Sequence, residues 1–212
     1  MKETKMGSSS KRYRLPKPHL SWSAVDLVER DPIEYTRAYI LGEPRYESEA
    51  MLFGKKFATA MEQGKPDQDD TEAMKFLVQI GIPRLEMVEH RMEIEVGGIP
   101  FIIVLDTVAA DLKRFREYKT GMQPWDQRKV DSHGQLVLYG LGLYLATKQM
   151  PECHLDWIRT HYDPVSGELT ADGTWQTFKR KPFTLVEFGA MTNRVVRAAE
   201  KIDALMREQG KA

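Results

Sequence analysis

Three acid-x-Lys triplets occur in this sequence, and their surroundings decide which of them could do chemistry. Glu3-Thr4-Lys5 lies in a polar N-terminal segment, and Asp111-Leu112-Lys113 lies in a polar turn, where both charges would be solvated. Glu117-Tyr118-Lys119 instead falls inside "RFREYKTG", which is predicted to be a strand. Because residues i and i+2 of a strand point to the same face, Glu117 and Lys119 are expected to project together.

A second acid completes this pattern on the preceding strand. Asp106 directly follows the apolar run "FIIVL", and a short turn joins that strand to the one that carries Glu117. A carboxylate at the end of a buried strand is costly unless something compensates its charge, and a metal ion would do so. Two carboxylates and a lysine suit metal-assisted phosphodiester hydrolysis, in which the acids hold Mg²⁺, the metal activates water, and the lysine offsets phosphate charge. The alternative is a solvated pair of charges at strand ends.

The order of these motifs resembles the PD-(D/E)XK nuclease superfamily, in the branch of the RecB nuclease domain and the phage recombination exonucleases. The resemblance rests on "GGIPFIIVLD", on "EYKTG", and on Gln135 and Tyr139 in "QLVLYGLGLYLA", which match a Gln-x-x-x-Tyr helix motif. The upstream "LSWSAVDLVERDPIEYTRAYILG" is similar to the usual opening of the family, so the resemblance covers roughly residues 20–160.

The resemblance implies a role for each matching residue. Asp106 and Glu117 would bind one or two Mg²⁺ or Mn²⁺ ions, and Lys119 would position or activate water and stabilise developing charge. Gln135 and Tyr139 would hold DNA near the scissile bond. Gln135 as a simple helix cap and Tyr139 as a core residue remain the alternatives.

One position departs from the family pattern. Many relatives carry a metal-binding histidine in a Gly-x-x-x-His-x-x-x-Glu helix, but here Gly54 and Glu62 flank Ala58 at the histidine position. Glu62 is the predicted substitute metal ligand, with Glu49 as second choice and an ordinary solvated glutamate as the alternative.

Other residues invite functional interpretations that the motifs do not support directly. His90 and His133 invite a metal or catalytic role because of the general chemistry of imidazole, but neither falls on a family motif. Trp125 could stack on a base or close the core. The basic run of residues 179–181, together with residues 55–56, could follow phosphates or form a solvated face.

Composition narrows the class of protein. The 212 residues carry 31 Lys+Arg and 31 Asp+Glu, so any nucleic-acid contact must come from a local basic patch rather than from bulk charge. Cys153 is the single cysteine, which excludes an intrachain disulfide and an iron–sulfur cluster held by this chain. We expect Cys153 itself to be a small buried residue rather than a nucleophile. Without an apolar run of about 18 residues or a signal-like start, a cytoplasmic protein that does not span a membrane is expected.

The hydrophobic patterns predict an α/β fold with a central mixed β-sheet flanked by helices, and the family resemblance implies a restriction-endonuclease-like core. Residues 1–18 are expected to form a flexible basic arm, and residues 19–212 a single nuclease-like domain. The predicted helices include residues 49–63, 71–79, 135–148 and 184–208. The predicted strands are residues 87–96, 101–110, 114–121, 154–163 and 174–183, with "GGIP" as a turn and "MQPWDQRKVDSHG" as a loop.

The residues and the resemblance together imply a metal-dependent DNA nuclease, and the resemblance alone implies an exonuclease of DNA recombination or repair of the phage type. Its expected partner is DNA, double-stranded with free ends, and a homo-oligomer and a recombination partner protein are further expectations from the family. The alternative is an inactive nuclease fold that serves as a DNA-binding or assembly module, which Ala58 favours. A nuclease that acts on RNA is a third hypothesis.

Overall fold

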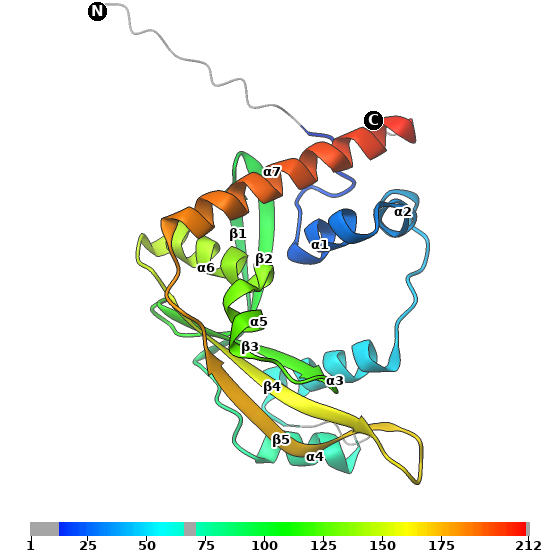
Figure 1. Ribbon diagram of the computed structural model, residues 1–212, viewed down its shortest axis with the longest axis vertical. Helices are drawn as coiled ribbons and strands as arrows, with labels where there is room; N and C mark the ends of the chain where they lie inside the picture. Colours follow the sequence, from blue (N-terminus) through cyan, green and yellow to red (C-terminus); the bar gives the residue numbers. More distant parts are fainter. Residues whose placement is uncertain (1–12, 66–70, 211–212) are drawn as a thin grey trace, which may run out of the picture. The chain divides into compact units, whose positions relative to one another are not determined.

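The computed structural model describes residues 13–65 and 71–210. Helical elements are α1 (Trp22–Arg30), α2 (Pro32–Tyr35), the π-helix η1 (Thr36–Leu41), α3 (Glu49–Gln63), α4 (Glu72–Gln79), α5 (Gln127–Ser132), α6 (Gly134–Thr147) and α7 (Leu185–Glu208). The strands are β1 (Met87–Val96), β2 (Ile99–Val108), β3 (Arg114–Gly121), β4 (Glu152–Tyr162) and β5 (Leu169–Lys179) (Figure 1).

The five strands form one mixed sheet in the order β1-β2-β3-β4-β5. β3 pairs antiparallel with β2 and parallel with β4, and β4 pairs antiparallel with β5. Parallel neighbours require a crossover connection, and α5 and α6 provide it between β3 and β4. The predicted α/β fold with a central mixed sheet and flanking helices is therefore confirmed.

The turn between β1 and β2 is shorter than the sequence predicted. Only Gly97 and Gly98 form it, with φ of +60° and +80°, and Ile99 and Pro100 already belong to β2. Positive φ at both central residues gives the twist that suits a two-residue hairpin, and glycine adopts it without strain.

The chain divides into two compact units. One comprises Met1–Pro44, Glu93–Ile102 and Thr192–Ala212, and the other comprises Arg45–Met92 and Ile103–Met191. In the first unit Leu20 bridges to Phe101, and the Arg14 backbone N–H donates to Asp203 at 3.1 Å. The predicted arm falls mostly on residues 1–12, outside the described residues, and the single domain from residue 19 stays a prediction. Every candidate site residue belongs to the second unit.

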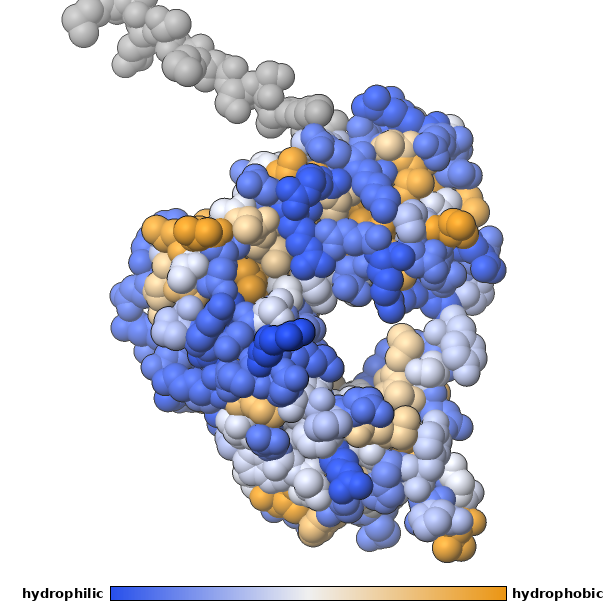
Figure 2. Space-filling model, viewed as in Figure 1, coloured by the Kyte–Doolittle hydropathy of each residue, from blue (hydrophilic) through white to orange (hydrophobic). Residues whose placement is uncertain are grey.

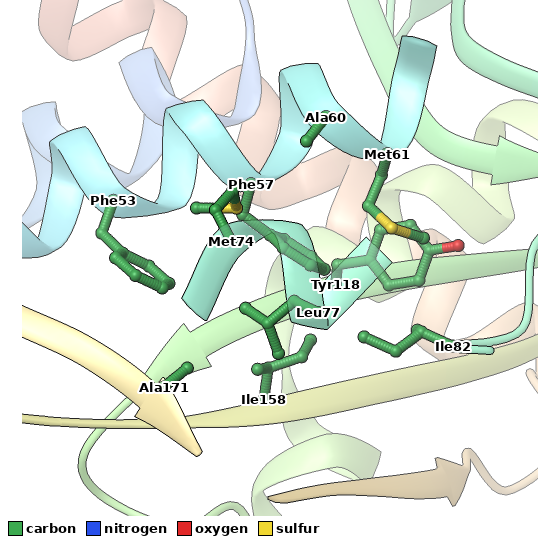
Figure 3. Packing of buried hydrophobic residues seen from close by; sticks show 10 residues of the cluster. All are labelled: Phe53, Phe57, Ala60, Met61, Met74, Leu77, Ile82, Tyr118, Ile158 and Ala171. Atoms are coloured by element: carbon green, nitrogen blue, oxygen red, sulfur yellow. The ribbon is translucent and has the colours of Figure 1, made fainter. Parts of the chain in front are cut away.

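Alternation along β3 sends its side chains to two differently covered faces of the sheet. Tyr118 packs edge-on against Phe57 of α3, with ring centroids 5.8 Å apart, in an apolar cluster that also includes residues of α4 (Figure 3). Phe115 points to the other face and contacts Tyr139 of α6, with ring centroids 6.5 Å apart. Because Glu117 has the same parity as Phe115, the predicted chemical residues of β3 face α6 rather than α3.

The helix α5 was not predicted, and its brevity explains why. Six residues give too little periodicity to recognise, yet Asp126 caps the helix by accepting a hydrogen bond from the Lys129 backbone N–H at 2.7 Å. β5 also begins five residues earlier than predicted and ends at Lys179. Beyond it, the Arg180 side chain is buried against Phe183 and paired with Glu187 at 2.7 Å.

The visible surface is mostly hydrophilic, with hydrophobic residues in separate small patches (Figure 2). Within residues 13–65 and 71–210, no helix combines the length and the apolar character that crossing a membrane requires.

Candidate active site

Glu117 is the buried centre of the candidate site. Only 2% of its surface is exposed, and its Oε1 accepts hydrogen bonds from Lys119 Nζ at 2.8 Å and from Gln135 Nε2 at 2.7 Å. Its Oε2 is buried and has no hydrogen-bond partner among the described residues. A buried carboxylate oxygen without a donor is unfavourable, so the site has an unmet need for a cation or a proton at this atom.

Gln135 joins the sheet to α6 and connects most of the predicted site residues. Its Oε1 accepts from Lys119 Nζ at 2.9 Å, while its Nε2 donates to Glu117 and to the Tyr139 hydroxyl, the latter at 2.9 Å. Both amide N–H groups and the carbonyl are therefore used, which fixes the orientation of the amide. Tyr139 is buried one helical turn further along α6, as the i, i+4 spacing requires.

Asp106 approaches the same region from β2. It lies one residue before Thr107, which pairs with Arg116, so continuation of that register brings Asp106 opposite Glu117. Its Oδ2 accepts a hydrogen bond from the Tyr118 backbone N–H at 2.6 Å, and its side chain is half-buried. The structure thus brings Asp106, Glu117, Lys119, Gln135 and Tyr139 together.

The electrostatics of these groups are strongly coupled. Burial, reinforced by the charge of Asp106, raises the pKa of Glu117 to about 8, against the partial opposition of Lys119. Burial likewise raises the pKa of Asp106, although Lys119 and the Tyr118 N–H act in the opposite direction. Burial acts to lower the pKa of Lys119, but the carboxylates of Glu117 and Asp106 outweigh it and the pKa is raised. Lys119 therefore remains an ammonium ion.

Glu89 is a further acid at this site that the sequence did not single out. It lies in β1 with φ of +44°, a left-handed conformation that is strained for a residue with a Cβ. Burial, followed by the charges of Asp106 and Glu62, raises its pKa to about 7. Strained backbone is concentrated at functional sites, and here it coincides with an acid coupled to Asp106. Alternation could not single it out, since Glu93 and Glu95 stand at the same parity of the strand and are exposed.

Glu62 reaches the site only indirectly. It is exposed near the end of α3, where its backbone carbonyl accepts a hydrogen bond from Arg84 Nη2 at 3.0 Å. Within the described chain it makes no hydrogen bond to Asp106 or Glu117, and its charge acts on Glu89. Glu49 begins the same helix thirteen residues earlier, about 20 Å away at 1.5 Å per residue. Ala58 offers no ligand atom.

The donor set fits a hard divalent cation. No three His, Cys, Asp or Glu side chains among residues 13–65 and 71–210 are arranged as a preformed metal-binding group. Mg²⁺, however, is usually bound through one or two carboxylates, with water and substrate phosphates completing its coordination. Asp106 and the unpartnered Glu117 Oε2 supply that type of donor, and mutual repulsion of the acids favours a cation among them.

The remaining reactive residues are placed outside this group. His133 is the residue directly before α6, and its ring lies against Trp125 with centroids 5.0 Å apart. Cys153 is 2% exposed, and burial raises the pKa of its thiol, which confirms a small buried residue there. His90 lies in β1 beside Glu89.

Comparison with known proteins adds information about the fold. No family model matches the sequence, and no curated protein matches it significantly. A solved structure from Eubacterium rectale, of a protein named "putative exonuclease", superposes with a TM-score of 0.59 at 11% sequence identity, covering 100% of this chain and 88% of that chain. At this identity the likeness establishes a shared fold, while function must be argued from the site.

Proposed function

We propose that this protein is a metal-dependent DNA nuclease of the PD-(D/E)XK superfamily. The observation that carries this proposal is the connected group of Asp106, Glu117, Lys119 and Gln135, in which a buried carboxylate oxygen of Glu117 has no donor. The acids and the lysine come from two neighbouring strands and the amide from the crossover helix, as in the motif order of that superfamily.

Asp106 and Glu117 would hold a Mg²⁺ or Mn²⁺ ion, with Glu89 as a third carboxylate and Glu62 at the outer edge. A bound divalent cation supplies Lewis acidity toward a phosphoryl oxygen and lowers the pKa of bound water. One or two ions are compatible with this number of acids.

Lys119 acts through its charge in this proposal. Because the surrounding carboxylates raise its pKa, its ammonium group is a poor base but a good donor to a phosphate oxygen. Gln135 fixes the positions of Lys119 Nζ and Glu117 Oε1 by a hydrogen bond to each. The Tyr139 hydroxyl, from the same helix, accepts a further hydrogen bond from Gln135. The positive charge is therefore already in place where negative charge would develop.

Exonuclease action on double-stranded DNA with free ends is the preferred form of this activity. The name of the Eubacterium rectale protein that shares the fold supports exonuclease action. The family resemblance is the basis for four further proposals. They are a role in DNA recombination or repair, a cytoplasmic location, a homo-oligomer that encircles DNA and a recombination partner protein.

A second candidate function is an inactive nuclease fold that binds DNA or assembles with other proteins. Ala58 favours it, because this α3 position lacks the histidine of many relatives. The connected acids and Lys119 weigh against it, since a scaffold gains nothing from a buried carboxylate whose pKa is raised to about 8.

The two functions are separated by incubating wild-type protein with an end-labelled linear duplex and with a closed circle of the same sequence. Each substrate is tested with Mg²⁺, with Mn²⁺ and with EDTA. Metal-dependent loss of the linear form alone supports an exonuclease, and cutting of the circle indicates an endonuclease. Binding of DNA without cleavage under any metal would replace the nuclease proposal with the inactive module.

A further inference from the structure

Trp125 lies in the segment between β3 and α5, and its indole is held by contacts with two neighbouring side chains. Lys129 Nζ lies 4.1 Å from the ring centroid, and the His133 ring packs edge-on with its centroid 5.0 Å away. The side chain nevertheless remains partly exposed. A tryptophan whose position is fixed while part of its ring faces solvent is suited to stacking against a flat ligand.

The short helix beside Trp125 is tied firmly to the end of β5. Gln127 Nε2 donates to the Lys179 carbonyl at 2.9 Å and to Asp131 Oδ1 at 2.9 Å. Asp131 Oδ1 also accepts from the Lys181 backbone N–H at 2.8 Å. These bonds hold α5 against the end of β5 and the segment that follows it.

Cations dominate the exposed part of this surface. Arg128 and Lys129 are exposed on α5, and the side chains of Lys179 and Lys181 are 62% and 56% exposed.

The neighbouring acids are largely occupied. Asp126 and Asp131 accept from backbone N–H groups, and Glu187 is held at 2.7 Å by the buried Arg180. Lys179 pairs with Glu152 at 3.3 Å, but exposed pairs of this kind are weak and exchange readily for a phosphate.

The surface lies close to the candidate active site along the chain. Trp125 follows Lys119 by six residues, so their Cα atoms are within about 20 Å of each other. At ~3.4 Å rise per nucleotide, a strand of about six nucleotides covers that distance. His133, which touches Trp125, directly precedes the helix whose second residue is Gln135.

We propose that Trp125, Arg128 and Lys129 form a platform for one unpaired segment of a DNA strand that continues from the active site. Trp125 stacks on a base, and Arg128 and Lys129 contact the flanking phosphates. Stacking requires an unpaired base, because the faces of bases within a duplex are already covered by their neighbours. The DNA partner rests on the proposed function, whereas the binding itself is measurable without cleavage.

The test measures the affinity of a fluorescently labelled 12-nucleotide single strand by anisotropy in EDTA, together with the same strand carrying abasic sites throughout its centre. Trp125→Ala is expected to weaken binding of the normal strand by roughly 5- to 100-fold and to leave binding of the abasic strand nearly unchanged. Trp125→Phe keeps a stacking face and is expected to stay within about threefold of wild type. Arg128→Ala is expected to reduce the slope of the logarithm of affinity against the logarithm of salt concentration by about one, for the normal and the abasic strand alike.

Lys113→Ala is the matched control, since it removes an exposed cation from the β2–β3 turn. Equal binding of the normal strand by Trp125→Ala and wild type would overturn the proposal, and so would equal losses on normal and abasic strands. Failure of the nuclease proposal has a different signature, namely intact base-dependent binding with no cleavage by the wild-type protein in Mg²⁺ or Mn²⁺.

Discussion

Lys119 donates a hydrogen bond from Nζ to Glu117 Oε1 at 2.8 Å, across two residues of the same strand. Glu117 Oε1 thus has its hydrogen-bond donor, yet among the described residues Glu117 Oε2 remains buried without one. One lysine therefore neutralises only part of the negative charge that Glu117, Asp106 and Glu89 bring together. The site favours an additional cation, and most of its expected behaviour follows from that imbalance.

Glu117→Gln is expected to flatten the pH dependence of stability. In the folded protein the pKa of Glu117 is about 8, against 4.5 ordinarily, so the folded state holds a proton that the unfolded state releases. The free energy of unfolding therefore falls as pH rises from about 5 to about 8, and Glu89, with a pKa of about 7, adds a change of the same sign. Thermal melting in EDTA should show the variant above wild type at pH 8 by roughly 2–6 °C.

Glu72→Gln serves as the control for that measurement, because its side chain is 90% exposed on α4. It should follow the wild-type profile. A Glu117→Gln profile as steep as that of wild type would show that Glu117 does not carry the proton.

Divalent metal should stabilise the protein in the absence of DNA. Mn²⁺ at about ten times its dissociation constant is expected to raise the melting temperature by about 2–5 °C. At one fixed Mn²⁺ concentration the gain should be larger at pH 8 than at pH 6, because binding displaces protons from the acids. Asp106→Asn should abolish the gain, and Glu89→Gln should reduce it. An equal gain in Asp106→Asn would place the metal elsewhere.

Gln135→Ala and Tyr139→Phe separate the two members of the helix motif. Gln135 holds both Lys119 and Glu117, so its loss should lower the cleavage rate by about 10- to 100-fold. Tyr139 contributes a hydroxyl that accepts from Gln135, and its replacement by phenylalanine should cost less than about tenfold. Rates measured in single turnover with saturating protein isolate this effect from DNA binding. A larger loss for Tyr139→Phe than for Gln135→Ala would reverse the assigned roles.

Asp156→Ala should damage the fold rather than the chemistry. Asp156 is fully buried and accepts two hydrogen bonds from Arg116, at 2.8 Å and 2.7 Å, on the face of β3 opposite to Glu117. Removing it leaves a buried guanidinium unpaired, which typically costs about 3–5 kcal/mol. Denaturant unfolding should report that loss. Thr177→Val, which removes only one hydroxyl partner of this pair, should cost about 1 kcal/mol.

Much of this site could be predicted because local rules determine it. Strand alternation placed Glu117 and Lys119 on one face of β3, and helical spacing placed Gln135 and Tyr139 on one face of the helix α6. Glu89 could not be found in the same way, because its role depends on a left-handed backbone conformation within an otherwise regular strand. The short helix α5 escaped notice because its stability comes from long-range bonds to Lys179 and Lys181 rather than from its own pattern.

The most direct test of the proposed nuclease is the metal-dependent cleavage rate of Lys119→Ala on a linear duplex, beside Lys113→Ala and wild type. In the proposed mechanism the Lys119 ammonium group would face the scissile phosphate, so its removal should lower the rate by about 100-fold or more. Mn²⁺ stabilisation should be retained, and Lys113→Ala should cleave like wild type. Cleavage by Lys119→Ala at the wild-type rate would contradict the assignment of this site.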